Sequence, residues 1–144
     1  EGSISAPFLF MNNTRAVAVI FLLGLFSFGV LGILLYMLNI GLIGGLYALF
    51  VLLGVQPMPN IFLAGIAPHG IFEIPAVMIG SAVALYMGAA LVTPQTGKSM
   101  GEVMIELFAD WVKIFLGVVI PLLAIAAVME AYVTPGLLIN AMAK

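Results

Sequence analysis

The feature that most constrains this chain is a run without charge that extends from Ala16 to Gly97 and is interrupted only by His69 and Glu73. Charged residues make up 7% and hydrophobic residues 65% of the 144 residues. In ordinary soluble domains roughly a quarter of the residues are charged. A run this long and this apolar needs a lipid environment, in which backbone polar groups are satisfied inside helices. The sequence therefore predicts an integral membrane protein.

Composition also excludes several classes of function. The chain has no cysteine, so it has no disulfide, no thiolate metal site and no thiol nucleophile. Its basic residues are few and scattered, which leaves no patch for the phosphate backbone of a nucleic acid. These basic residues are Arg15, Lys98, Lys113 and Lys144. We therefore expect membrane lipid, and not nucleic acid, as a partner.

Apolar length and helix-breaking residues together predict the membrane spans. A crossing helix needs about 20 apolar residues, and the first such stretch ends where Asn39 and nearby glycines interrupt it. The second stretch is short for a crossing and ends in a turn with Pro57 and Pro59, because proline disfavours helix in the residues before it. The predicted spans are residues 16–38, 40–55, 68–92 and 111–131.

The apolar run that contains His69 is too long for one straight crossing. It extends from Ile61 to Val92, which is about 48 Å of helix against a hydrocarbon core of about 30 Å. We therefore expect a short re-entrant or interfacial segment at residues 61–67. A helix should begin at Pro68, where the missing N–H of a first-turn proline has no cost. Pro75 should then bend this helix.

Small residues recur every four positions along the same helix. Such a smooth face lets another helix approach closely, so we expect a helix-packing face that serves contacts within the chain or between two copies of a homodimer. The members of this face are Ala76, Gly80, Ala84 and Gly88.

A helix with one charged side is predicted between the third and fourth spans. Ser99 and Glu102 form a capping-box pattern. The favoured interpretation is a solvated surface helix over residues 100–113, with Trp111 at the level of the lipid headgroups. The alternative is an acidic docking strip for a partner protein, formed by Glu102, Glu106 and Asp110.

A second short amphipathic helix is predicted over residues 135–142, with Thr134 as its N-cap. The predicted fold class is thus all-α. We expect one membrane domain over residues 1–144, a polytopic transmembrane helical bundle with a re-entrant or broken-helix segment and an amphipathic surface helix.

The intramembrane histidine and glutamates are the candidate functional residues. His69 and Glu73 lie four positions apart and share one face of a helix. Ionisable groups inside a membrane usually face the bundle interior, and Glu130 near the end of the last span must do the same. We hypothesise one buried polar cluster of these three side chains. Asparagines that could reach it are Asn12, Asn13 and Asn39.

Three interpretations of this cluster compete. In the favoured one, His69 and Glu73 cap broken helix ends near Pro68, and Glu130 completes a hydrogen-bonded network. In the second, one imidazole and two carboxylates bind a metal ion such as zinc. In the third, the cluster is part of a path for protons, ions or small solutes, or of a lipid or peptide cleft. Imidazole-to-carboxylate contacts of about 2.7–3.2 Å would indicate the network, and convergence at about 2.0–2.2 Å on a shared centre would indicate a metal.

No known catalytic pattern is present. The histidine motif is HGIFE and not HExxH, the only aspartate is Asp110, and no GxSxG or Walker-type loop occurs. The sequence therefore predicts no catalytic residue, no bound metal and no cofactor, so we do not expect an enzyme. The alternative is an intramembrane metal-dependent or catalytic protein that uses the three cluster residues.

Several segments are together typical of one family. They are FMNNTRA (10–16), the break at Asn39, Gly41 and Gly44, PHGIFEIPA (68–76) and AVMEAYVTP (127–135). In order and spacing they resemble the stage II sporulation protein M family, from about Phe8 to Leu138, with HGIFE as the most specific part. By this resemblance the family's motif positions are Asn12, Asn13, Pro68, His69, Gly70, Glu73, Pro75 and Glu130.

The resemblance implies a multi-pass protein of the cytoplasmic (inner) membrane. In spore formers such a protein anchors a peptidoglycan-degrading complex during engulfment, with the hydrolytic activity in its partners. We therefore expect a non-enzymatic scaffold that contacts lipid and other membrane or envelope proteins, with a homodimer as one option for its assembly. Relatives also occur in organisms that form no spores, so a sporulation role does not follow. Family members commonly carry another helix upstream, and we expect this chain to be a fragment that lacks it.

Overall fold

The computed structural model describes residues 5–54, 58–93 and 97–143. It confirms the predicted all-α membrane bundle, because four helices are long and apolar enough to cross a membrane. The elements are α1 (Ala6–Phe26), α2 (Val30–Leu52), α3 (Met58–Val92), α4 (Met100–Ile114), the π-helical η1 (Phe115–Val119), α5 (Ile120–Val128), the π-helical η2 (Met129–Val133) and α6 (Thr134–Met142).

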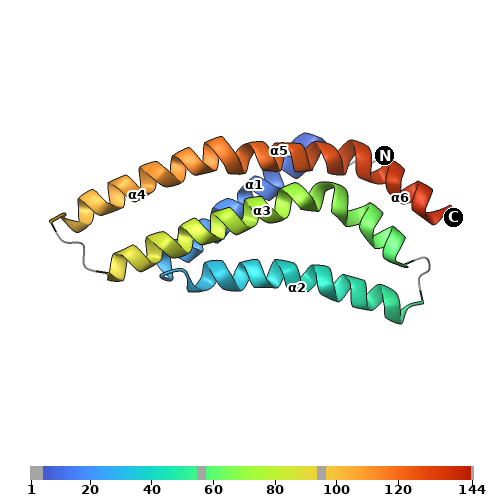
Figure 1. Ribbon diagram of the computed structural model, residues 1–144, viewed down its shortest axis with the longest axis horizontal. Helices are drawn as coiled ribbons and strands as arrows, with labels where there is room; N and C mark the ends of the chain where they lie inside the picture. Colours follow the sequence, from blue (N-terminus) through green and yellow to red (C-terminus); the bar gives the residue numbers. More distant parts are fainter. Residues whose placement is uncertain (1–4, 55–57, 94–96, 144) are drawn as a thin grey trace.

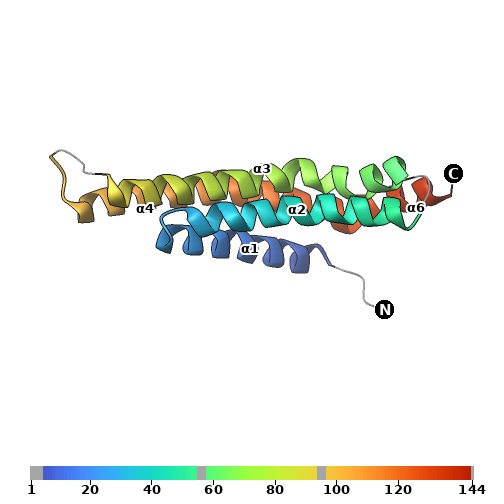
Figure 2. The same ribbon diagram turned by 90° about the horizontal axis from the view of Figure 1, so that it is seen from below.

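Helix α3 is the centre of the bundle. Figure 1 shows it between α2 and the long helical run formed by α4, α5 and α6, and α1 crosses behind it at an angle. Figure 2, seen from below, shows α1 on the outside of the bundle beside α2. Helix α3 contacts α1, α2, α5 and α6. A residue on α3 can therefore meet side chains from every other part of the chain.

The predicted first span, residues 16–38, is wrong because a tight turn divides it. Phe28 and Gly29 take left-handed backbone conformations, with φ of 54° and 93°, which reverse the chain between α1 and α2. The Ser27 hydroxyl donates to the carbonyl four residues earlier at 2.6 Å and accepts from the N–H four residues later at 2.8 Å. The second span accordingly starts earlier than the predicted 40–55.

The predicted break before Pro68 is also absent from the described residues. Helix α3 runs without interruption for 35 residues, with Pro68 and Pro75 inside it, so the segment 61–67 is simply its N-terminal part. Figure 1 shows the N-terminal part of α3 bending toward α2. Each proline removes one hydrogen bond and bends the axis, but in a membrane no water competes for the remaining ones, so the helix continues.

The predicted helices 100–113, 111–131 and 135–142 form one continuous run. The capping box of Ser99 and Glu102 begins it, as predicted. Two π-helical turns interrupt its α-helical geometry, and each ends two residues before a proline, Pro121 or Pro135. A proline ring clashes with the carbonyl four residues earlier, and the wider π turn relieves this clash. The hydrogen bonds shift with it, so the N–H of Thr134 bonds to the carbonyl five residues before.

The small residues of α3 pack against α1. All of them are buried, namely Ala76, Gly80, Ala84 and Gly88. A Cβ added at Gly80 would lie 2.7 Å from Val17 Cγ1, and one added at Gly88 would lie 2.5 Å from the carbonyl carbon of Phe28. This face is therefore covered by the chain's own α1 and its turn, and it is not open to a second copy.

Candidate functional site

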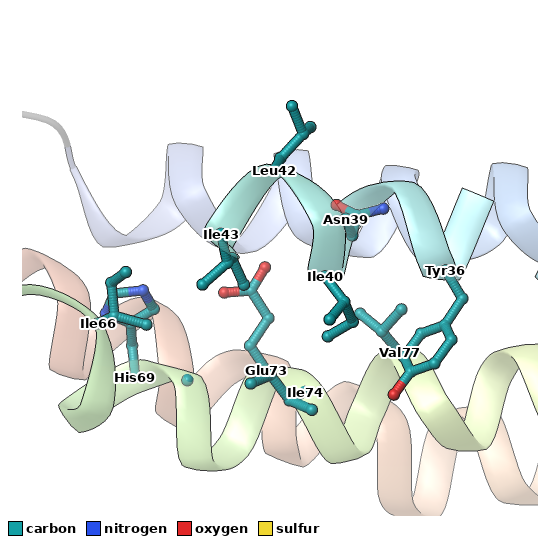
Figure 3. A pocket seen from close by; sticks show the side chains of 11 residues that line it. Tyr36, Asn39, Ile40, Leu42, Ile43, Ile66, His69, Glu73, Ile74 and Val77 are labelled. Carbon is teal, nitrogen blue, oxygen red and sulfur yellow. The ribbon is translucent and has the colours of Figure 1, made fainter. Parts of the chain in front are cut away.

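The structure brings the three predicted ionisable residues together. His69 and Glu73 lie one turn apart on α3, Glu130 lies on η2, and all three side chains are half-buried. One ligand atom from each side chain lies within 4.8 Å of the others. Figure 3 shows His69 and Glu73 rising from α3 on the same side, toward α2. The cluster thus forms where the bent part of α3 meets the second π turn.

The predicted hydrogen-bonded network is not observed. In the described part of the chain, no hydrogen bond or ion pair joins the imidazole of His69 to Glu73 or Glu130. Because α3 is continuous, His69 and Glu73 lie in a helix interior and cannot cap helix ends. The capping interpretation is therefore wrong, and in the described residues the imidazole of His69 makes its hydrogen-bonding contact with Thr134 instead.

Thr134 is the contact of His69 that sequence reasoning missed. Its Oγ1 lies 3.5 Å from Nδ1 of His69 and donates to the carbonyl of Met129 at 3.1 Å. Since its single proton goes to that carbonyl, the hydroxyl oxygen can accept from Nδ1–H, which leaves the lone pair of the imidazole on Nε2. The signal in the sequence is a threonine directly before Pro135, where we expected only an N-cap.

A cavity of about 240 Å³ adjoins the cluster between α2 and α3. Its polar lining consists of Tyr36 and Asn39 from α2 and His69 and Glu73 from α3, and the rest is apolar. Figure 3 shows these side chains around the space between the two helices. The amide nitrogen of Asn39 donates to the carbonyl of Leu35 at 2.8 Å, so its oxygen remains an acceptor. The cavity can therefore hold a small polar molecule beside Glu73.

The other predicted asparagines lie on α1, outside the three-residue cluster. Asn12 lines a second hollow together with Arg15, and Asn39 is the residue that both hollows share. The amide nitrogen of Asn13 is buried and has no hydrogen-bond partner among the described residues. Of the three asparagines that the sequence proposed, the structure thus places only Asn39 beside His69 and Glu73.

The remaining motif residues shape the backbone around the cluster. Pro68 and Pro75 lie inside α3 on either side of His69 and Glu73. Gly70 is buried and lines the cavity, and a Cβ there would touch the Ile66 side chain at 3.4 Å. These residues bend α3 and keep its surface open next to the two ionisable side chains.

The charged face of α4 lies apart from this cluster. Lys98 pairs with Glu106 at 2.6 Å and Lys113 with Asp110 at 2.8 Å, and all four side chains are exposed. Trp111 packs into the bundle. Its ring stacks on Phe21 with centroids 4.0 Å apart, and its N–H is buried without a partner among the described residues, an arrangement that does not favour a headgroup anchor, which needs an accessible N–H.

Comparison with known families agrees with the resemblance seen in the sequence. The family model described as Stage II sporulation protein M matches residues 2–135. Comparison with curated proteins and with solved structures gave no match. The matched region includes all elements that build the cluster, from α1 to the start of α6. With its four apolar helices, this multi-pass membrane protein therefore belongs to the stage II sporulation protein M family.

Proposed function

We propose that this chain is a non-enzymatic membrane scaffold that holds partner proteins at the cytoplasmic membrane. The observation that carries the proposal is the shape of the C-terminal run. It extends over 43 residues from Met100 to Met142, which is about 65 Å of helix and twice the hydrocarbon thickness of about 30 Å. One end must extend beyond the hydrocarbon, and the charged side chains of α4 favour that end.

Helix α4 has the two faces that an adaptor helix needs. Its apolar side chains Met104, Leu107 and Trp111 pack against a core formed by Phe21, Ala84 and Met87, so the helix is fixed to the bundle. Its charged side chains are exposed on the outside. A rigid helix with an exposed charged surface supports specific docking of a protein with complementary charges.

The family relationship indicates the class of partner. The stage II sporulation protein M resemblance implies envelope-remodelling machinery in which the partners carry the hydrolytic activity. We therefore expect the partner of α4 to be another membrane or envelope protein, and the chain itself to supply position and not chemistry.

Site-specific photo-crosslinking in native membranes tests this function. A photoreactive residue in place of Glu106 should give one discrete protein adduct, identified by mass spectrometry as an envelope protein. The matched control is Leu116, which is 60% exposed on the same helical run but apolar, and there we expect lipid adducts. Charge reversal at Asp110 should weaken the protein adduct. Equal adducts at both positions, or none at Glu106, would contradict the scaffold function.

A further inference from the structure

The ligand atoms of the three cluster residues lie at separations close to those found in metal sites. Ligand atoms bound at 2.0–2.2 Å to one zinc ion lie about 3–4 Å from each other, and those of His69, Glu73 and Glu130 lie within 4.8 Å. The upper limit exceeds that range by less than about 2 Å, so small side-chain rotations would place all three around one ion.

The two negative charges of the cluster also favour binding of a cation. Two carboxylates share one half-buried space, and like charges this close are unfavourable unless a positive group neutralises them. Within the described residues the ion pairs of Lys98 and Lys113 lie on α4 and the turn that precedes it, and Arg15 lines a different hollow. His69 can supply one positive charge at most, whereas a divalent ion balances both carboxylates.

Thr134 orients the histidine as an outer-shell partner does in metal sites. A histidine that binds a metal commonly donates its other ring N–H to an oxygen, which fixes the tautomer. Here the Nδ1 contact with Thr134 at 3.5 Å leaves Nε2 as the nitrogen with the lone pair.

We propose that His69, Glu73 and Glu130 bind one divalent first-row transition-metal ion, of which zinc is the simplest probe. One imidazole and two carboxylates suit such an ion better than magnesium, which prefers oxygen ligands alone. Three protein ligands leave a coordination position for a further ligand, and the neighbouring 240 Å³ cavity has room for water or a small polar molecule. This site joins α3 to η2 and is independent of the docking role of α4.

Metal retention by the purified full chain tests the site. After chelator treatment, incubation with Zn²⁺ and gel filtration, elemental analysis should find about one zinc per wild-type chain. Glu73→Gln and Glu130→Gln keep the side-chain shape and remove a charge, so both variants should stay folded and monodisperse but bind zinc at least tenfold more weakly. The matched control, Glu106→Gln, changes an exposed carboxylate on α4 and should retain zinc as the wild type does. Excess Mg²⁺ should not displace the zinc.

A variant that removes the hydroxyl group of Thr134 but no metal ligand gives a second test. Thr134→Val should weaken zinc binding about 10–100-fold through loss of the outer-shell contact. X-ray absorption of the zinc-loaded wild type should show nitrogen and oxygen neighbours at about 2.0–2.2 Å, and this result does not depend on the folding of any variant. Equal zinc retention in wild type, Glu73→Gln and Glu130→Gln, or a shell of water oxygens alone, would overturn the proposal.

Discussion

The close contact between α3 and the turn that joins α1 to α2 makes Gly88 highly sensitive to substitution. A Cβ added there would lie 2.5 Å from the carbonyl carbon of Phe28 and 2.7 Å from the nitrogen of Gly29. These are backbone atoms of a turn in left-handed conformations, so no side-chain rotation can move them away. The substitution Gly88→Ala therefore forces α3 and the turn apart by about 1 Å to restore ordinary contact.

The expected cost follows from two opposing contributions. Alanine gains up to about 1 kcal/mol over glycine in a helix interior. Overpacking in a close-packed core costs about 1–3 kcal/mol and occasionally more, and the rigid backbone partner puts this site at the upper end. We expect Gly88→Ala to lower the free energy of unfolding by about 1–2 kcal/mol. The matched control is Gly44→Ala on α2, where a Cβ meets nothing within 4 Å, and there we expect a gain of up to about 1 kcal/mol.

Equilibrium unfolding of the purified protein in mixed micelles, with helicity measured by circular dichroism during a titration with sodium dodecyl sulfate, gives both free energies. The decisive result is the sign of the difference between the two variants. If Gly88→Ala is as stable as Gly44→Ala, the turn does not lie on α3 at this position and the covered helix-packing face is wrong.

Three further predictions concern the turn, the π-helical segment and the cap. Ser27→Ala should lower the free energy of unfolding by about 1–2 kcal/mol in the same titration, because the N–H that Ser27 accepts at the start of α2 loses its partner; no change would contradict the turn geometry. Pro135→Ala should let the π turn revert to α-helix and rotate Glu130, which lowers zinc affinity about tenfold without loss of helicity; unchanged affinity would separate the π turn from the site. Ser99→Ala removes the capping hydroxyl, so hydrogen exchange in the first turn of α4 should accelerate about fivefold, as expected for a cap worth about 1 kcal/mol, while exchange in α3 stays unchanged.

Apolar composition predicted the fold class, but hydropathy could not locate the first turn. A hydropathy window measures apolar length, and the residues that reverse the chain at 27–29 include Phe28, which extends the apolar stretch. The turn depends on two left-handed backbone conformations and on the two hydrogen bonds of Ser27. Both are properties of the folded backbone and its contact with α3.

The effect of Pro68 differs from the prediction for a related reason. By the rules for soluble proteins, Pro68 predicts the start of a helix. Residues 61–67 are then expected to form a separate segment. In a membrane the remaining backbone groups of α3 have no water to bond to, so the helix continues through Pro68 and Pro75 and only bends. The sequence therefore identified both prolines as points of distortion, but it predicted a helix start at Pro68, where α3 only bends.

Part of the candidate site could be predicted from the sequence, and part could not. Helical spacing placed His69 and Glu73 on one face, and the cost of a carboxylate in hydrocarbon pointed to Glu130. The sequence alone did not predict the direction in which the side chain of Glu130 points. One extra residue in a π turn rotates the rest of a helix by about 100°, and whether a proline produces a π turn or a kink depends on packing.

The groups around the cluster also bear on what kind of ligand it can accept. Two carboxylates and the free oxygen of Asn39 are all electron-rich. Their combined potential is negative, so it repels anions and favours a positively charged occupant. A proton shared by the carboxylates neutralises one charge, whereas a divalent ion neutralises both and also binds the lone pair on His69. Zinc retention in Glu73→Gln therefore distinguishes these two occupants, because a shared proton is lost without any change in metal content.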